Sequence, residues 1–151
     1  MKKGIVIVFS EDEDRIYKDE IKNLSNQKDI KLCLVNNGSK DSTLQILKSV
    51  KDDLESNCIF IIDIKKNMGI NTAAKAGARF LFSIGDLKYI VYLSSNILGY
   101  FKNKQFEVLE KIEKELAGTY VLKKTRRNIK KFYSPKDFSL LSSVLMYLFQ
   151  H

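Results

Sequence analysis

The sequence predicts an α/β protein with three layers, α/β/α, around a mostly parallel, Rossmann-like central sheet. Two observations predict this fold. Four short apolar runs lack polar alternation, which is typical of strands that are buried on both faces of a parallel sheet. Segments with apolar residues at helical spacing separate these runs, and alternating strands and helices favour helices on both faces of the sheet. The length of 151 residues fits a single domain over residues 1–151.

The predicted strands cover residues 5–9, 32–35, 59–62 and 89–93. Apolar residues at helical spacing predict a helix in each of the three intervals between them. The residues of these stripes are, in chain order, Tyr17, Ile21 and Leu24; Leu44, Leu47, Val50 and Leu54; and Ile70, Ala73, Ala74, Gly77, Phe80, Leu81 and Ile84. Together with a further amphipathic helix over 106–116, which ends at Gly118, these elements form a predicted core over residues 1–118.

Residues 119–151 are expected to form a strand at 119–124, a basic segment that contains Pro135, and an apolar helix over about 138–149. This last helix contains no charged side chain, and at roughly 18 Å it is too short to cross a bilayer. Its apolar surface must be buried in this core, in a protein partner or second copy, or in a membrane interface.

The charge is concentrated near the C-terminus. The chain has 26 Lys and Arg against 18 Asp and Glu, a net charge of +8. Residues 119–136 contain seven basic residues and no acid, so residues 1–118 are nearly balanced. Such a segment attracts the phosphates of nucleic acid, of anionic lipid or of a small molecule, and a solvated loop without a ligand is the alternative.

Composition excludes several classes of protein. With 44% apolar and 29% charged residues, the chain is neither disordered nor collagen-like nor a disulfide scaffold. It has no apolar stretch long enough to span a membrane and no signal peptide, so we expect a cytoplasmic protein that touches a membrane surface at most. Cys33 and Cys58 lie in apolar runs without metal-ligand or redox spacing, and are expected to be reduced, buried thiols.

Polar segments follow each predicted strand, at the edge where open α/β sheets bind ligands. They begin at Ser10, Asn36, Lys65 and Ser94. Each has a structural explanation as well: Asp41 or Ser42 suits the cap of the next helix, and Gly69 suits a turn before a helix whose N-terminus could bind an anion.

Taken in order, these segments resemble the family 2 glycosyltransferases, which have the GT-A fold and move a sugar from a nucleotide-diphosphate donor. Ser10 stands at a small hydroxyl position, Asp12 at a usual Asn, and Glu13-Asp14 at an acidic pair. The family's two acids followed by Gly-Ser-x-Asp-x-Thr match residues 36–43, with both acids replaced by amides. Its Asn-x-Gly-x-x-x-Ala-x-Asn-x-Gly pattern matches residues 67–77, with Lys75 in place of the second Asn.

The tail is loosely similar to that of polyprenyl-phosphate glycosyltransferases, in Gly118 to Arg127 with the basic and apolar stretches that follow. The resemblance implies that residues 123–149 approach a lipid phosphate or membrane surface. It also implies a set of substrate-binding positions. The implied binding residues for a nucleotide-diphosphate sugar are Ser10, Glu11, Asn37, Ser39, Gly69, Lys75, Ser95 and Asn96. Arg126 and Arg127 are the implied phosphate-binding residues.

The sequence also departs from the family. Active members hold a divalent metal, Mg²⁺ or Mn²⁺, with an Asp-x-Asp motif where this chain has Ser95 and Asn96, so no strong metal site or other cofactor is expected. The family position that binds the base is Asn37, an amide in place of a carboxylate. The acceptor half that supplies the general base is missing, which suggests a divergent and truncated member, and no catalytic residue is identified.

Three hypotheses remain. A metal-independent glycosyltransferase would place the fixed charge of Lys65, Lys66, Lys75 or the Arg126/Arg127 pair at the diphosphate. A catalytically inactive binding or regulatory pseudoenzyme would pair with itself or with a protein partner through its last helix. A nucleic-acid binder is disfavoured, because the basic segment has few interleaved aromatic residues.

Overall fold

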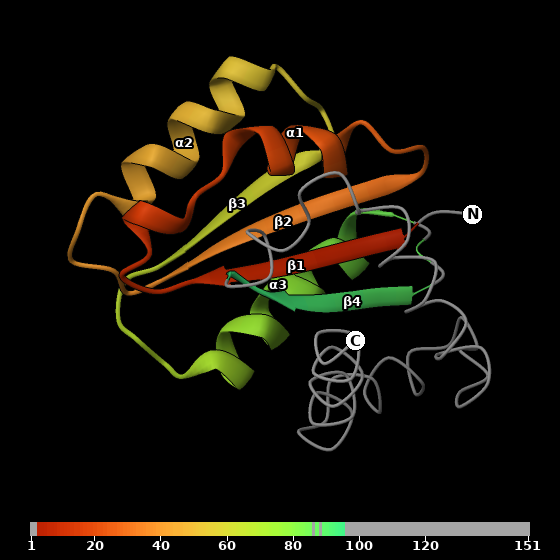
Figure 1. Ribbon diagram of the computed structural model, residues 1–151. Coiled ribbons are helices and arrows are strands. Elements are labelled where there is room, and N and C mark those ends of the chain that lie inside the picture. The colour runs from red at the N-terminus through yellow and green to blue at the C-terminus, as the bar shows by residue number, and fades with distance from the viewer. Residues whose placement is uncertain (1–2, 86, 88, 96–151) are drawn as a thin grey trace, which may run out of the picture.

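The computed structural model describes residues 3–85, 87 and 89–95 (Figure 1). This part of the chain contains four strands: β1 (Lys3–Phe9), β2 (Ile30–Asn37), β3 (Ile59–Ile64) and β4 (Tyr89–Ser94). They form one sheet in the order β3-β2-β1-β4, and every neighbouring pair is parallel. The predicted parallel sheet is confirmed, and each predicted strand lies within an observed one.

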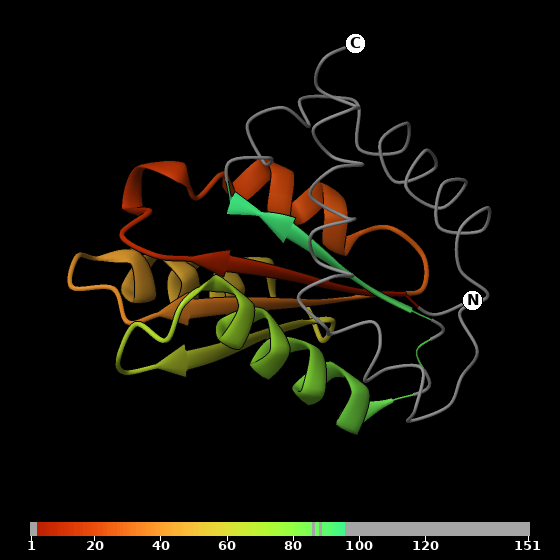
Figure 2. The ribbon, with the colours of Figure 1, turned by 90° about the horizontal axis from the view of Figure 1, so that it is seen from below.

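Helices cover both faces of this sheet. α1 (Lys18–Ser25) and α2 (Thr43–Leu54) lie on one face, and α3 (Ile70–Ile84) lies on the other, as Figure 2 shows. A short 3-10 helix, η1 (Glu13–Arg15), lies between β1 and α1. The three-layer α/β/α arrangement predicted from the sequence is therefore confirmed in the described residues.

The core lies around the two inner strands. β1 and β2 are buried over almost their whole length, because each has a strand on both sides and helices on both faces. β3 is an edge strand, and only its first residue, Ile59, is fully buried. α3 approaches the sheet closely at Gly77, where an added Cβ would lie 2.7 Å from Val6 Cγ1 and 2.8 Å from Val35 Cγ2.

Three apolar residues predicted on the buried stripes are instead exposed. Tyr17 precedes α1 and is 39% exposed, while Ile70 and Ile84 are the first and last residues of α3, with 56% and 36% exposed. The prediction was wrong there because residues at helix ends extend beyond the sheet that covers the middle of the helix. The helix predicted at 106–116, the strand at 119–124 and the helix at 138–149 lie outside the described residues.

Neither cysteine forms a disulfide, as expected. Cys33 is buried, and burial raises the pKa of its thiol to about 12. Cys58 is only partly buried, so that part of the prediction was wrong: it lies in the loop before β3, outside the sheet. Within the described residues, no helix has the length and apolar character to cross a membrane.

Candidate functional site

The carboxyl ends of all four strands lie at one edge of the sheet, where the β1–α1, β2–α2 and β3–α3 loops meet (Figure 1). From β1 the chain moves outward to β2 and β3, then returns to place β4 on the other side of β1. The strand order therefore reverses between β1 and β4. In open α/β sheets, such a reversal opens a crevice in which ligands bind.

The loop after β1 and the loop after β2 are joined by reciprocal hydrogen bonds through Glu11. Its backbone N–H donates to Ser39 Oγ over 3.1 Å, and its Oε1 accepts from the Lys40 N–H over 2.6 Å. Glu11 has a positive φ of 51°, which is rare for a residue with a side chain. The Glu11 carboxylate thus joins the two loops.

The same two loops also meet at the N-terminus of α2. Glu13 Oε2 accepts from the Ser42 N–H over 3.0 Å, and Asp41 Oδ1 accepts from the Thr43 N–H over 3.0 Å. Ser42 is the N-cap residue, but Asp41 and Glu13 supply the side-chain oxygens. These bonds satisfy backbone donors and place negative charge at the positive end of the helix dipole. The hydrogen bond from the Thr43 hydroxyl is the main cause that lowers the pKa of Asp41.

Asn67 connects three segments of the site. Its Oδ1 accepts from Asn37 Nδ2 over 3.2 Å and from the Gly69 N–H over 2.9 Å. Its Nδ2 donates to Ser10 Oγ over 3.2 Å. One exposed amide therefore joins the end of β1, the end of β2 and the start of α3.

Asn37 uses both ends of its amide inside the protein. Its Oδ1 accepts from the Met68 N–H over 3.1 Å, its Nδ2 donates to Asn67, and the residue is 1% exposed. Nearby, Gly38 has a φ of 65°, and a Cβ on it would lie 2.2 Å from the Asn67 backbone nitrogen. The loops after β2 and β3 therefore pack backbone against backbone, which only glycine permits at this position.

Asp12 is the buried carboxylate at the crevice between β1 and β4. It is 8% exposed, and its Oδ2 accepts from the Ser10 N–H over 2.7 Å and from Ser95 Oγ over 3.0 Å. Its Oδ1 lies 3.6 Å from an Arg15 guanidinium nitrogen. Because both carboxylate oxygens have partners, Asp12 positions the loop after β1 against the end of β4.

A second pair of polar residues faces α2 from the ends of β2 and β3. Asn36 and Asp63 are direct neighbours across the sheet, and Asn36 Nδ2 donates to Asp63 Oδ1 over 2.9 Å. A hydrogen bond from Lys65 and then the one from Asn36 lower the pKa of the Asp63 carboxyl. Beside them is a hollow of about 210 Å³, which Lys40, Asp41 and Lys65 also line.

The described residues do not fit a divalent metal. They contain no group of three His, Cys, Asp or Glu side chains placed to hold an ion. At the end of β4, Ser95 offers a hydroxyl, and the only carboxylate bonded to it is Asp12, whose oxygens are already engaged. Hard cations need several oxygen ligands with carboxylate charge, and this set does not supply them.

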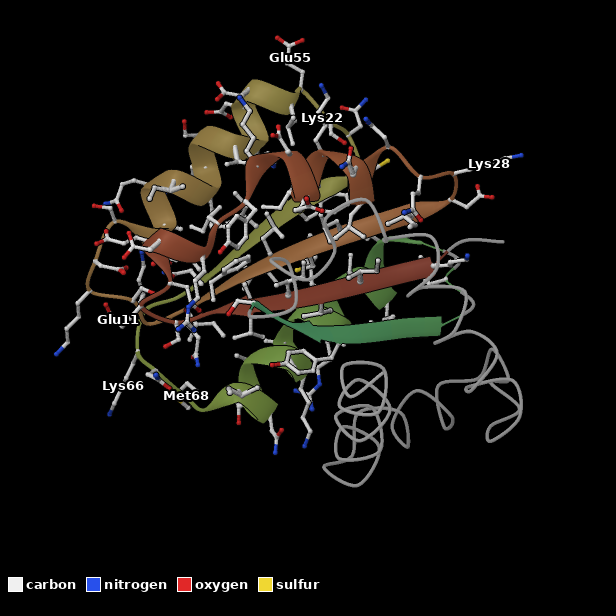
Figure 3. All side chains as sticks on the ribbon, viewed as in Figure 1. Glu11, Lys22, Lys28, Glu55, Lys66 and Met68 are labelled. Carbon is white, nitrogen blue, oxygen red and sulfur yellow. The ribbon has the colours of Figure 1, made fainter. Side chains whose placement is uncertain are left out.

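Positive charge and backbone donors are instead available beside the β3–α3 loop. Lys65 and Lys66 are exposed, and the ammonium of Lys65 is ion-paired with Asp63. Gly69, which precedes α3, supplies no side-chain cap. The first amides of a helix without a cap suit an anion, and nearby ammonium groups add to the attraction. Figure 3 shows Lys66 and Met68 on this loop, with Glu11 on the neighbouring loop.

The structure brings six of the predicted substrate-binding residues to this edge: Ser10, Glu11, Asn37, Ser39, Gly69 and Ser95. Lys75 lies apart, in the second turn of α3. Asn96, Arg126 and Arg127 lie outside the described residues. Sequence reasoning did not single out Asp12 and Asn67 as site residues, although both occupy positions in the motifs that it used.

Known proteins resemble this chain in sequence and fold. The sequence model of glycosyl transferase family 2 matches residues 5–95. An uncharacterized protein, MJ0544, of Methanocaldococcus jannaschii is 27% identical over 115 residues, which are 76% of this chain and 47% of that protein. The chain therefore spans about half the length of this curated relative.

Two solved structures are similar in fold. The mannosyltransferase PcManGT of Pyrobaculum calidifontis, in complex with GDP-Man and Mn²⁺, has a TM-score of 0.52 at 12% identity, over 62% of this chain and 27% of that chain. S. aureus TarS in complex with UDP has a TM-score of 0.49 at 18% identity, over 63% of this chain and 27% of that chain.

Proposed function

Since the chain belongs to glycosyl transferase family 2, we propose that its carboxyl edge binds the diphosphate of a nucleotide-sugar donor without a divalent cation. One observation carries this proposal. The carboxylates of Glu11, Asp12 and Glu13, which follow β1, are all used to hold the loops together, so none of these three is left free for a metal. The charge that stabilises the diphosphate must then come from cationic side chains and backbone amides.

The exposed groups of the β3–α3 loop suit this task. Lys65, Lys66 and the first amides of α3 would receive the phosphates, and Ser10 and Ser39 would lie beside the ribose and the base. Asn37 would position the loops rather than read the base, because both ends of its amide are engaged. PcManGT, which shares the fold, is in complex with GDP-Man, and this makes GDP-Man the first donor to test.

The C-terminal segment would complete the site. Residues 119–151 supply Arg126 and Arg127, whose charge suits a second phosphate, either of the donor or of a polyprenyl-phosphate acceptor. In this proposal residues 1–118 form the donor-binding unit, and residues 123–149 face the acceptor or the membrane surface.

Calorimetric titration tests donor binding. UDP, GDP, UDP-glucose and GDP-mannose are titrated into the full chain with Mn²⁺ and again with a chelator. We expect binding that the chelator does not abolish and that weakens about tenfold in Lys65→Gln/Lys66→Gln, whereas the control Lys22→Gln/Lys28→Gln at the other edge leaves it unchanged. Binding that appears only with Mn²⁺, or no binding at millimolar concentration, would overturn the proposal.

A second candidate is a binding module that does not turn over its donor. The observation that favours it is again the engagement of Glu11, Asp12 and Glu13 in loop contacts, because a general base needs a free carboxylate near the acceptor. It predicts donor binding without release of nucleoside diphosphate over hours. It also predicts a concentration-dependent oligomer that Leu141→Ser or Leu145→Ser weakens, as sedimentation would show.

A further inference from the structure

β3 is the outermost strand of the sheet on the side away from β4 (Figure 1). Every second residue of a strand faces the same neighbour, and the Ile64 carbonyl accepts from the Gly38 N–H at the end of β2 over 2.8 Å. By this alternation, Ile59, Ile61 and Asp63 direct their N–H and C=O groups away from β2. In the part of the chain that the structure describes, no strand lies on that side. These three residues therefore present a row of backbone donors and acceptors to a further strand.

This edge lacks the features that keep most edge strands from pairing, which are lysine, proline or a bulge. The sequence of β3 is Ile-Phe-Ile-Ile-Asp-Ile, and its register with β2 is unbroken from Ile59 to Ile64. Its only charged side chain, Asp63, is already bonded to Asn36 and Lys65. A regular, partly exposed and mainly apolar strand of this kind favours pairing with another strand.

We propose that two copies of this chain pair along β3 in antiparallel orientation, about a two-fold axis beside Ile61. Ile61 would then face Ile61 of the second copy, and Ile59 would face its Asp63. Residues opposed in this way exchange both N–H···O bonds. Phe60 would stand opposite Ile62, an apolar pair of the kind that stabilises neighbouring strands. The contact closes after two copies, because each copy uses its β3 edge once.

The position of α2 leaves room for this pairing. α2 packs on both β2 and β3, so it lies over the sheet and not across the open edge of β3. Neighbouring strands are about 4.8 Å apart, so the α2 helices of the two copies would lie roughly 10 Å apart. Packed helices have a similar spacing, about 8–10 Å. The two sheets can therefore join while α2 packs against its own copy.

The charges on α2 favour a second copy over an unrelated strand. A hydrogen bond from Lys65 is the main cause that lowers the pKa of Asp63, and the charge of Lys48 adds to it. Lys48 therefore lies on the β3 side of α2. Asp52 follows it by one helical turn, and both side chains are exposed. Because a two-fold axis reverses the direction of α2, Lys48 of each copy would lie opposite Asp52 of the other.

Sedimentation of the full chain over a range of concentrations tests the pairing. We expect a monomer–dimer equilibrium in which Lys48→Glu raises the dissociation constant about tenfold, because opposite charges between the two α2 helices become like charges. The exchange Lys48→Glu/Asp52→Lys should restore the native value. The control Lys28→Glu, in the loop before β2, should change it less than about twofold.

Several results would overturn the proposal. They are a chain that stays monomeric up to about 1 mM, assembly that continues beyond a dimer, and a dimer that Lys48→Glu does not weaken or that the exchange does not restore. The experiment needs no nucleotide, so its result is independent of the proposed donor binding.

Cross-linking distinguishes β3 from other surfaces of the chain. In a Cys58→Ser background, Ile61→Cys places two thiols at the axis, where opposed Cα atoms are about 5.5 Å apart, within disulfide range. Cys33 stays unreactive because burial raises the pKa of its thiol to about 12. Mild oxidation should link the Ile61→Cys chains in pairs, and Lys28→Cys in the same background should stay unlinked. A dimer that Leu141→Ser abolishes and that Ile61→Cys does not link would contradict pairing along β3.

Discussion

Asn36 and Asp63 show how a substitution at one position of the sheet depends on its neighbour. The family resemblance places an acid at position 36, but here an amide donates to the carboxylate of Asp63, its direct neighbour on β3. Asn36 is 3% exposed, and its Oδ1 has no partner within the described residues. The pair therefore holds one carboxylate and one amide, a combination that avoids two like charges side by side at the end of the sheet.

Restoring the acid at position 36 should destabilise the protein. Asn36→Asp places a buried carboxylate directly beside the partly buried carboxylate of Asp63, and we expect it to lower the free energy of unfolding at pH 7 by about 2 kcal/mol. The exchanged pair Asn36→Asp/Asp63→Asn should regain at least half of that loss. Urea unfolding of the two variants and of Asp63→Asn alone measures this coupling. If the changes in the free energy of unfolding of the two single variants simply added up in the double variant, the proposed coupling of Asn36 and Asp63 would be wrong.

The sequence predicted the strand ends and their polar residues, but not how these residues pair. Residues 67–77 identified the loop, whereas the connecting role of Asn67 depends on Ser10 and Asn37, which lie far from it in the chain. Similarly, the role of Asp12 depends on Ser95, which directly follows β4. Such pairings depend on strand order, which apolar patterns alone do not specify.

At the scale of elements, α3 shows what close packing requires. The apolar stripe predicted this helix, and its middle does face the sheet through Ala73, Ala74, Gly77 and Leu81. The predicted burial was wrong at both ends of the helix, where Ile70 and Ile84 extend beyond the sheet and are exposed. Periodicity thus indicates which face of a helix is apolar, but the extent of the sheet decides which residues are buried.

Gly77→Ala tests this packing. The new methyl group would lie within 2.8 Å of branched methyl groups of Val6 and Val35, and neither stiff side chain has room to move. Alanine is more favourable than glycine within a helix by roughly 1 kcal/mol, but we expect the free-energy cost of overpacking to exceed this gain. The net effect should be a loss of about 1–2 kcal/mol in the free energy of unfolding, measured by chemical denaturation.

Gly85→Ala is the matched control, because the same substitution just after α3 meets only the flexible end of Lys31. It should leave the free energy of unfolding nearly unchanged. If Gly77→Ala were as well tolerated as Gly85→Ala, the close approach of α3 to the sheet would be wrong.

At the scale of the whole molecule, the strand–helix alternation predicted the three-layer fold, since each parallel crossover requires a helix on one face. The alternation could not predict how charge divides between the faces, because that depends on which helix covers which face. The concentration of basic residues on the α3 side therefore emerged only with the fold.

Acid should destabilise the protein through two carboxylates, Asp41 in the loop before α2 and Asp63 near the end of β3. Hydrogen bonds lower the pKa of Asp41, mainly from Thr43, and of Asp63, mainly from Lys65. A lowered pKa in the folded state stabilises the protein above about pH 4, the unfolded value, and this contribution is lost as the pH falls through the folded value. The melting temperature of the native chain should therefore fall more steeply between about pH 5 and pH 3 than the melting temperature of Asp41→Asn/Asp63→Asn. If the melting temperatures of the two proteins fell in parallel with pH, the hydrogen bonds assigned to Asp41 and Asp63 would be wrong.

The measurement that tests the central claim most directly is a nuclear magnetic resonance titration of the isotope-labelled chain with GDP-mannose in the presence of a chelator. Metal-free binding at the carboxyl edge predicts shifts of the backbone amides of Ser10, Ser39 and the residues from Met68 to Ile70, with none at Lys28 or Glu55 on the other edge. Amides that shift only after Mg²⁺ is added, or only at the other edge, would contradict it.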